Sequence, residues 1–552
     1  MRCELQRAVL AGALLTLLSP LASLSQAQPT TEEAAAALRF DILEFVVVGN
    51  TMLEPLAIEK AVYPFLGPGR SVADAEGARK ALEKAYQDAG FLSVTVDIPP
   101  QRVGERGELR LVVVEAKVDR LRVTGARYHL PSAVAAEVPS LAPDSVPNFN
   151  DMQDELARLA RQTSNREVTP LIAAGDVPGT MNVELKVQDS LPLSAFAELN
   201  SKQSVNTERG RFEASLSYDN LFQRQHSLGA YWFVSPRDPE QANILSLTYH
   251  APLGGPDDQL YVLWTKSDSN TPTSLGGATV ARGTTWGLRW RDALIGPPGM
   301  QHALTWGFKY SDLQDRNDAV AGFTVESPPM RYPSFSVQYE LIGVDAATGR
   351  QTTFDAGLNF SIAALSRREV DCNGHQVDQF ECKRSGAKPG FQVLTLAASH
   401  REPLFKDWSL FVRGQAQLTL DPLVPSEQSV QGGIDTVRGY FESEQSGDDM
   451  LGLRVELSTP RFGVGAGAGL RALTFFDRAM LKRISPLPGE LSIIQMGGIG
   501  LGLRVDTAIG LQVRFDWARA LFDTQQLDSA GALQPVTNAR DTRWELGIRQ
   551  TF

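Results

Sequence analysis

Alternation of apolar and polar residues dominates the chain from Leu191 to its end. Residues 511–517 show it clearly, because Leu, Val, Phe and Trp occupy every second position and Gln, Arg and Asp lie between them. The same period recurs in segments of about ten residues, among them 304–310, 451–458, 499–506 and 544–549. This period is typical of β-strands with one apolar face, since successive side chains of a strand point to opposite sides.

The lengths of these segments and of their connectors favour a membrane as the neighbour of the apolar faces. About ten residues suffice to cross a bilayer as a tilted strand. Short connectors at 253–257, 295–300, 346–350, 405–407 and 507–510 alternate with long ones at 268–283, 312–332, 366–388, 421–449, 481–492 and 522–541. Short turns on one side and long loops on the other are typical of outer-membrane barrels. We therefore predict a transmembrane antiparallel β-barrel of about 16 strands over residues 191–552, with polar faces toward the lumen. A soluble sheet covered on one side would share the alternation.

Helical spacing replaces the alternation in residues 41–190, where one order of elements occurs twice. In residues 41–116, strands are predicted at 42–48, 92–98 and 109–115 and helices at 54–63 and 75–89. In residues 117–190, strands are predicted at 118–124, 167–173 and 181–188, with a short helix after Pro131 and a longer one capped by Asn148 or Asn150. Both copies have the order β-α-α-β-β, which predicts two tandem α+β domains that form a modular arm.

The first 27 residues have the features of a secretory signal peptide. Arg2 and Arg7 give it positive charge, residues 9–18 are apolar, and Ser25-Gln26-Ala27 precedes the expected cleavage site. A short segment, residues 28–40, then leads to the first α+β domain. The sequence therefore predicts an exported protein.

Two of the three cysteines, Cys372 and Cys382, remain once the signal peptide with Cys3 is removed. In an exported protein, two cysteines this close in sequence favour a disulfide within a loop. A metal site with His375 is the alternative, but two Cys and one His lack the ligand pairing of a zinc site. We therefore predict a loop disulfide.

Charge and composition narrow the class of function. The formal net charge is -11, which argues against nucleic acid as the main partner. No uncharged apolar run of about 18 residues follows the N-terminus, so we expect no transmembrane helix in the mature chain. The six histidines are scattered, and no paired acids or nucleophile–base pair stand out. We expect neither an enzyme nor a bound cofactor or metal.

One stretch of the long loop 420–450 differs from an ordinary loop. It runs Gly432-Gly433-Ile434-Asp435-Thr436-Val437-Arg438-Gly439-Tyr440. Its glycines allow tight or left-handed backbone, and an apolar and an aromatic residue lie close to its single cation. Such residues suit a loop that packs against another surface. An exposed turn that holds an arginine would show the same residues.

Four motifs, in order, give the chain a resemblance to a known family. Residues 98–103 with 107–115 resemble the end of a first POTRA domain, and residues 178–185 resemble the end of a second. Gly432-Gly433 with Val437-Arg438-Gly439-Tyr440 is similar to a signature loop motif, and Phe475-Phe476-Asp477 is similar to the barrel-wall motif that such loops contact. From about residue 40 onward, the chain resembles the two-partner secretion translocators of the haemolysin secretion/activation type, in the superfamily that joins POTRA domains to a β-barrel.

The resemblance implies an outer-membrane protein of a Gram-negative bacterium, with its POTRA domains in the periplasm. It implies export of a large exoprotein that has an N-terminal secretion domain, without a nucleotide. It also implies contact with outer-membrane lipids and, during biogenesis, with the barrel assembly machinery. The terminal Phe552 fits the C-terminal signature of such barrels, but Gln550 stands where an apolar residue is usual, which would weaken recognition by that machinery. Only residues 28–39 precede the first POTRA domain, which disfavours the plug helix found in the family.

Two other functions are compatible with parts of this pattern. An outer-membrane insertase that assembles other barrels would share the loop motif. A passive channel would share the barrel. Two POTRA copies favour secretion over the insertase, and a passive channel would have no need of them.

The resemblance also suggests a partner for Arg438. If the loop folds into the lumen, its guanidinium is partly desolvated and needs a counter-ion. Alternation places Asp477 on the same strand face as Arg471 and Phe475, which we assign to the lumen. We therefore predict an ion pair between Arg438 and Asp477 that latches the loop to the barrel wall.

Overall fold

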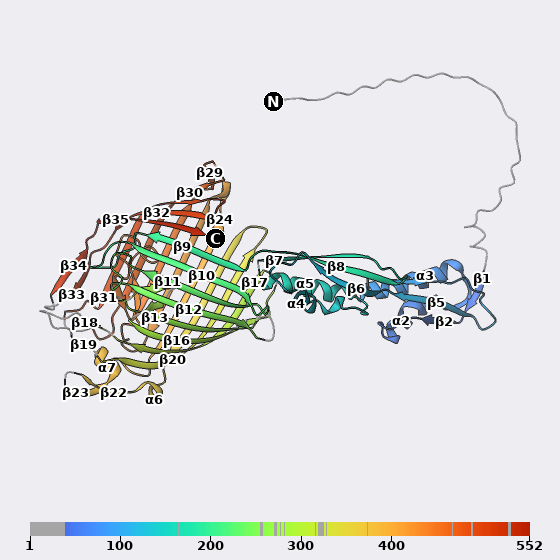
Figure 1. The fold of residues 1–552 in the computed structure, drawn as a ribbon, viewed down its shortest axis with the longest axis horizontal. Coiled ribbons are helices and arrows are strands. Elements are labelled where there is room, and N and C mark those ends of the chain that lie inside the picture. The colour runs from blue at the N-terminus through green and yellow to red at the C-terminus, as the bar shows by residue number, and fades with distance from the viewer. Residues whose placement is uncertain are drawn as a thin grey trace, which may run out of the picture. The chain divides into compact units, whose positions relative to one another are not determined.

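The computed structural model describes residues 39–552 apart from short gaps at 164, 254–257, 270–272, 276–277, 281, 298, 315, 318–324, 327, 373, 466, 487–488 and 528–531. The predicted signal peptide and most of segment 28–40, where a plug helix would lie, are outside the described residues. The chain divides into two compact units, and its helices and strands are labelled in Figure 1. The first comprises residues up to 122, 138–156 and 170–185, and the second comprises residues 123–137, 157–169 and 186–552.

The first α+β copy is a three-stranded sheet that packs against two helices. Strands β2 (Glu44–Val48), β5 (Glu108–Glu115) and β4 (Val94–Asp97) lie in the order β2-β5-β4, with β2 parallel to β5. Helix α2 (Pro55–Val62) leads into the short 3-10 helix η1 (Tyr63–Phe65). Helix α3 (Val72–Asp88) comes later in the chain. The predicted order β-α-α-β-β is confirmed.

Two local features of this copy differ from the prediction. Helix α3 begins at Val72 rather than Ala75, because Ser71 and Asp74 form a capping box that satisfies its first N–H groups. A small sheet of β1 (Arg39–Ile42) and β3 (Gly67–Ser71) adds to the copy. The Gly-Pro-Gly start of β3 has no alternating pattern, so sequence reasoning missed it.

The second copy has the same arrangement. Strands β6 (Lys117–Thr124), β8 (Thr180–Asp189) and β7 (Arg166–Ala174) lie in the order β6-β8-β7. Its helical elements are α4 (Pro131–Ala136), the 3-10 helix η2 (Pro139–Leu141) and α5 (Phe149–Gln162). Asn148 caps α5, because its side chain accepts the N–H of Asn150 at 2.9 Å.

Both copies close the turn after their first strand in one way. Gly49 and Gly125 have φ of 91° and 81°, and a Cβ at either position would lie 2.3 Å from a carbonyl oxygen of β5 or β8. The carboxylates that end those strands, Glu115 and Asp189, accept N–H groups of the turn at 2.8–3.1 Å. This shared geometry supports an internal repeat.

Sixteen antiparallel strands close into the predicted barrel. In pairing order they are β9 (Leu193–Asn200), β10 (Arg211–Leu221), β11 (His226–Val234), β12 (Asn243–Pro252), β13 (Gln259–Ser267), β16 (Gly283–Leu294), β17 (Met300–Leu313), β20 (Met330–Asp345), β21 (Arg350–Phe360), β24 (Gln392–Pro403), β25 (Ser409–Thr419), β28 (Asp449–Ser458), β30 (Gly469–Lys482), β31 (Ile493–Asp506), β32 (Leu511–Ala520) and β35 (Thr542–Thr551). The two-residue strand β29 (Phe462–Gly463) pairs with β30 in the turn after β28. Strand β35 pairs with β9 and closes the ring. The N–H of Phe552 donates to the carbonyl of Ala195 at 2.8 Å, so the terminal residue takes part in the closure.

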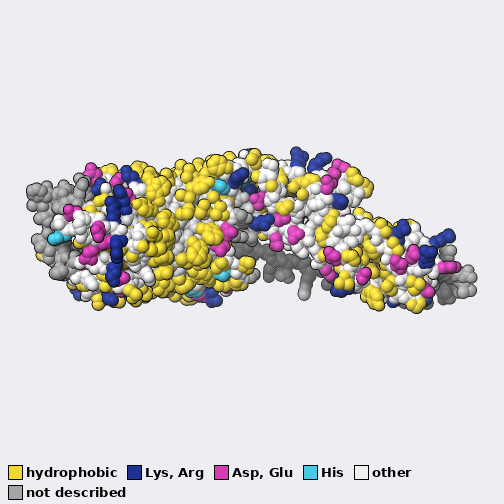
Figure 2. Space-filling model, turned by 90° about the horizontal axis from the view of Figure 1, so that it is seen from below, with side chains coloured by type: hydrophobic (Ala, Val, Ile, Leu, Met, Phe, Trp, Pro, Cys, Tyr) yellow, Lys and Arg dark blue, Asp and Glu magenta, His cyan; other side chains and the backbone are white. Residues whose placement is uncertain are grey.

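Apolar side chains cover the outside of the barrel. Six of the eight tryptophans, all in barrel strands, are exposed. Figure 2 shows a broad band of hydrophobic side chains on the face of the barrel that it presents. None of the described helices combines the length and the apolar character that a membrane crossing requires. The outward apolar band and the polar lumen follow from the alternation in each strand.

The long connectors carry small elements of their own. They include the hairpins β14 (Thr273–Leu275)–β15 (Ala278–Val280), β18 (Arg316–Asn317)–β19 (Val325–Glu326), β26 (Ser429–Gln431)–β27 (Gln445–Gly447) and β33 (Thr524–Leu527)–β34 (Leu533–Thr537).

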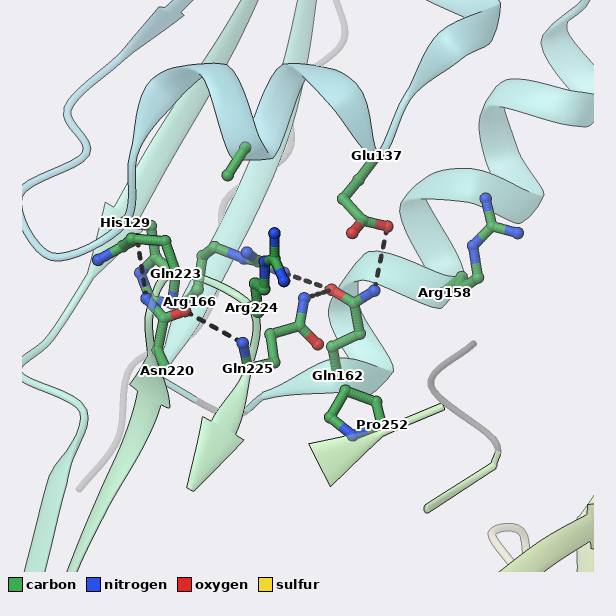
Figure 3. A pocket seen from close by; sticks show the side chains of 11 residues that line it. His129, Glu137, Arg158, Gln162, Arg166, Asn220, Gln223, Arg224, Gln225 and Pro252 are labelled. Carbon is green, nitrogen blue, oxygen red and sulfur yellow. Dashed lines mark hydrogen bonds between the residues drawn. The ribbon is translucent and has the colours of Figure 1, made fainter. Parts of the chain in front are cut away.

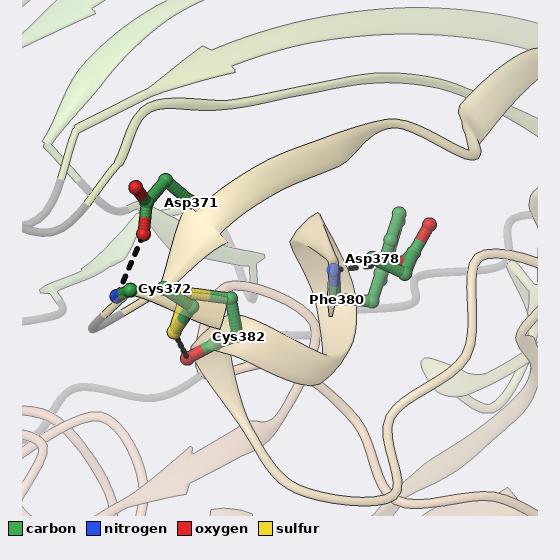
Figure 4. The surroundings of a disulfide bond; sticks show 6 residues. Asp371, Cys372, Asp378, Phe380 and Cys382 are labelled. Atoms are coloured by element: carbon green, nitrogen blue, oxygen red, sulfur yellow. Dashed lines mark hydrogen bonds between the residues drawn. A yellow bond between two sulfur atoms is a disulfide. The ribbon is translucent and has the colours of Figure 1, made fainter. Parts of the chain in front are cut away.

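The connector after β21 holds α6 (Ala363–Ser366), the hairpin β22 (Glu369–Cys372)–β23 (His375–Asp378) and α7 (Gln379–Lys383). Within it Cys372 and Cys382 form a disulfide (Figure 4), so these sulfurs are not a metal site with His375.

Candidate functional site

The connector between β25 and β28, residues 420–448, contacts the inner wall of the barrel and is called here the inner loop. The hairpin β26–β27 forms its stem. Near the start of the loop, Glu427 receives hydrogen bonds from Lys309 at 2.8 Å, Tyr332 at 2.5 Å and Asn359 at 3.0 Å. At its end, buried Asp448 pairs with Arg384 of the α7 connector. The two ends of the inner loop are therefore fixed by charged groups from other parts of the wall and its connectors.

Arg438 lies at the centre of the inner loop contacts. Its side chain is 3% exposed and its guanidinium makes a two-point contact with Asp477, with Nε to Oδ2 at 2.7 Å and Nη2 to Oδ1 at 2.8 Å. The backbone N–H of Arg438 donates to the same carboxylate at 3.1 Å. A bidentate contact of this kind fixes orientation as well as distance. The structure thus places the predicted pair of residues together.

Two further carboxylates surround the guanidinium. Glu456 of β28 lies 2.8 Å from it and Asp516 of β32 lies 3.8 Å from it. The ring of Phe475 lies under the guanidinium, 3.4 Å from its carbon to the ring centre, which is a cation–π geometry. Alternation had placed both acids on the polar face of their strands, but it gave no sign that they share one cation.

A second cation shares Asp477. Arg454 Nε lies 3.4 Å from Asp477 Oδ1, and Arg454 Nη2 donates to the carbonyls of Ile434 and Thr436 at 3.0 Å each. Arg454 therefore holds the backbone of the inner loop and the buried carboxylate at once. Because its contacts are to loop carbonyls, sequence reasoning had no signal for them.

The motif glycines allow the loop to lie directly against the wall. Gly439 has φ of 99°, and a Cβ there would meet the backbone of β32 at 3.1 Å. On the wall, Gly498 of β31 faces the carbonyl of Arg438, which a Cβ at 498 would approach to 1.9 Å. The glycine-rich face of β31 is therefore a docking surface for the loop backbone.

Apolar residues of the motif pack beside the ion pair. Val437 and Tyr440 are 2% and 0% exposed and belong to a buried cluster with residues of β28, β30, β31 and β32. The Tyr440 hydroxyl donates to the carbonyl of Phe522 at 2.9 Å and accepts the N–H of Gly497 at 3.2 Å. The motif thus joins a buried charge pair to an apolar contact with a satisfied hydroxyl.

A second charged group holds the tip of the motif. Asp435 lies 3.0 Å from Lys202 Nζ and 3.5 Å from Arg514 Nη1. The side chain of Asp435 is 59% exposed, and the partial desolvation that raises its pKa is outweighed by the charges of Lys202 and Arg514, which bring this pKa to about 2. Burial raises the pKa of Glu442 to about 6, against the attraction of Lys202 and with the repulsion of Asp435. Asp435 therefore stays ionised in the folded protein, while Glu442 becomes protonated as the pH falls through about 6.

Comparisons with known proteins agree with this architecture. Residues 40–116 match the POTRA domain of ShlB type, and residues 179–505 match the haemolysin secretion/activation protein family ShlB/FhaC/HecB. The outer membrane transporter CdiB of Escherichia coli is 22% identical over 491 residues, which is 86% of this chain and 78% of that protein. The haem/haemopexin transporter protein HuxB of Haemophilus influenzae is 20% identical over 515 residues, which is 89% of this chain and 86% of that protein.

Solved structures show the same fold. CdiB from Escherichia coli superposes with a TM-score of 0.59 at 18% identity, covering 96% of this chain and 93% of that one. CdiB from Acinetobacter baumannii gives a TM-score of 0.54 at 12% identity, covering 93% and 90%.

The fold defines an outer-membrane transporter with POTRA domains in the periplasm. The chain belongs to the haemolysin secretion/activation family, the translocators of two-partner secretion. Both relatives named here carry a transporter's name, and membership of the two-partner secretion family supports export of a partner protein.

Proposed function

We propose that this chain exports one large exoprotein through its barrel without a nucleotide, and that its two POTRA copies recognise the N-terminal secretion domain of that exoprotein. The observation that carries the proposal is the inner loop, held inside a closed 16-strand barrel by the buried Arg438–Asp477 pair. Such a loop occupies the lumen that a passive channel would leave open. In this proposal Gly432, Gly433, Val437, Arg438, Gly439 and Tyr440 form a latch, and Phe475 and Asp477 form its wall partner.

The edge strands of the POTRA sheets support the recognition step. Strand β7 is an edge strand of the order β6-β8-β7, and it runs for nine residues. Its Leu171 and Ile172 are 49% and 41% exposed. A long exposed edge with apolar side chains is suited to pair with an extended chain by β-augmentation. We assign β7 as a receiving edge for the exoprotein.

Removal of residues 41–188 tests the proposal, with a large exoprotein co-expressed and its appearance on the cell surface measured. We expect export to stop while the barrel remains inserted, which its heat-dependent mobility on a gel reports. A narrower variant, Ile172→Asp, places a charge at an exposed apolar position of β7, and Val48→Asp on β2, at a similarly exposed position on an edge of the other sheet, is its matched control. Unimpaired export by the deletion would overturn the proposal.

The absence of a nucleotide requirement has its own test. The purified chain in proteoliposomes should admit an unfolded secretion domain with no nucleotide present. The rival function, an insertase, predicts assembly of a second barrel in the same vesicles. Assembly of that barrel without uptake of the secretion domain would favour the insertase.

A further inference from the structure

A polar cavity of about 360 Å³ lies in the second compact unit, away from the inner loop (Figure 3). Its walls come from α4, α5, β7 and the turn between β10 and β11, and all of these lining residues belong to that one unit. Three arginines line it, Arg158, Arg166 and Arg224. Among its described lining residues, Glu137 is the one that carries a carboxylate. The lining therefore holds an excess of positive charge.

The buried arginine of this cavity lacks a partner for one of its donors. Arg166 is 6% exposed, and its Nη2 donates to the carbonyl of Leu159 at 3.2 Å and to Gln162 Oε1 at 2.9 Å. Its Nε is buried and has no hydrogen-bond partner within the described chain. A buried donor of a charged group that lacks an acceptor costs free energy, so the site is incomplete as it stands.

The other two arginines are also available to a ligand. Within the residues that the structure describes, no ion pair holds the guanidinium of Arg158 or of Arg224. The carboxylate of Glu137 is engaged instead by Gln162 Nε2 at 3.2 Å. An anion that enters the cavity would lie among these three lining arginines, and the guanidinium of Arg166 is already fixed in orientation by its other bonds.

We propose that this cavity binds a phosphate group. A phosphate presents several acceptor oxygens in a geometry that suits arginine, and its charge would balance the excess positive charge of the lining. The proposal concerns the ends of β10–β12 that face the periplasm and does not depend on how the exoprotein is recognised.

The surroundings of the cavity favour a phospholipid headgroup as the source of that phosphate. Pro252, which lines the cavity, ends the membrane strand β12. In the turn beside it, Phe222 is 75% exposed, and its ring packs edge-on to His226, which packs on Tyr249. Aromatic groups at strand ends lie at the headgroup level of barrels, and basic groups there attract lipid phosphates.

The test compares lipid retention by the full-length protein in detergent. Native mass spectrometry would measure bound phosphatidylglycerol and, as the phosphate-free lipid, monogalactosyldiacylglycerol. The variant Arg158→Gln/Arg224→Gln removes two partly exposed cations and leaves Arg166 in place. Arg127→Gln is the matched control, because Arg127 is an exposed arginine of the same region that does not line the cavity. Titration calorimetry would measure inorganic phosphate binding to the same proteins.

We expect the wild type and Arg127→Gln to retain phosphatidylglycerol and not the phosphate-free lipid. In the double variant, affinity should fall by about tenfold or more, since two charge-assisted hydrogen-bond donors are lost. Binding of inorganic phosphate without lipid retention would support the phosphate site and overturn the lipid source. Equal phosphatidylglycerol retention by the double variant would overturn the site. The site would also be overturned if the wild-type protein bound neither phosphate nor lipid, or if it bound only an acidic peptide such as polyglutamate.

Discussion

Replacement of Arg438 by Ala should release the inner loop from the barrel wall. The change removes both side-chain bonds to Asp477 and leaves that carboxylate, which is 0% exposed, with the backbone N–H of residue 438 at 3.1 Å and Arg454 at 3.4 Å. Loss of one member of a buried pair costs about 3–5 kcal/mol, because the other charge stays buried. Because Arg454 still lies beside Asp477, we expect a cost of about 3 kcal/mol, at the lower end of that range.

This energy should appear as loop opening rather than as barrel unfolding. The sixteen strands keep their ladder without Arg438, so the local equilibrium of the inner loop shifts first. A shift of about 3 kcal/mol raises the open population by roughly 150-fold. Val437→Cys is a suitable reporter, because Val437 is 2% exposed and the two cysteines of the described chain, Cys372 and Cys382, are joined in a disulfide.

The assay measures the rate of thiol labelling of Val437→Cys with and without Arg438→Ala. Arg461→Ala is the control, since Arg461 and Asp506 form a similar pair that is about half exposed, and such surface pairs contribute about 0–1 kcal/mol. A double-mutant cycle with Asp477→Ala then isolates the coupling between the two charges. Equal labelling rates in Arg438→Ala and Arg461→Ala, together with normal export, would refute the reasoning.

Three further predictions follow from other contacts. Gly498→Val should keep the barrel closed but accelerate the same labelling reaction, because its side chain would occupy the space of a loop carbonyl that a Cβ approaches to 1.9 Å; unchanged labelling would show that the loop does not lie on β31. Glu442→Gln should raise loop stability at pH 7.5 by up to about 2 kcal/mol and have little effect at pH 4. The pKa of Glu442 is raised from 4.5 to about 6, so its ionisation opposes folding increasingly as the pH rises through that window. A difference between the thermal labelling profiles of Glu442→Gln and the wild type that does not change with pH would contradict this prediction. Glu115→Gln and Asp189→Asn should each lower the melting temperature of the isolated 39–190 arm, at a cost of about 1–3 kcal/mol, because each removes an acceptor shared by several turn N–H groups; calorimetry that finds either variant as stable as the wild type would exclude this role.

Much of the architecture was available from the sequence. The alternation in segments such as 511–517 predicted the barrel strands and their outward faces, because a bilayer and a polar lumen impose opposite demands on successive residues. Helical spacing predicted both POTRA copies in their observed order. The two-stranded sheet β1–β3 was missed, since the glycine and proline residues of β3 carry no period and β3 pairs with a segment distant in sequence.

The sequence by itself determined which faces are apolar, how many strands close, and which residues of the inner loop are suited to packing. Only the tertiary structure decided how charges are shared: Arg438 faces three acids from three strands, and Arg454 supports both the loop backbone and Asp477. Sequence periodicity reports the side of a strand on which a residue lies. The partner of a buried charge depends on strand register and loop path, which are set by long-range pairing and by close backbone approach at positions such as Gly498.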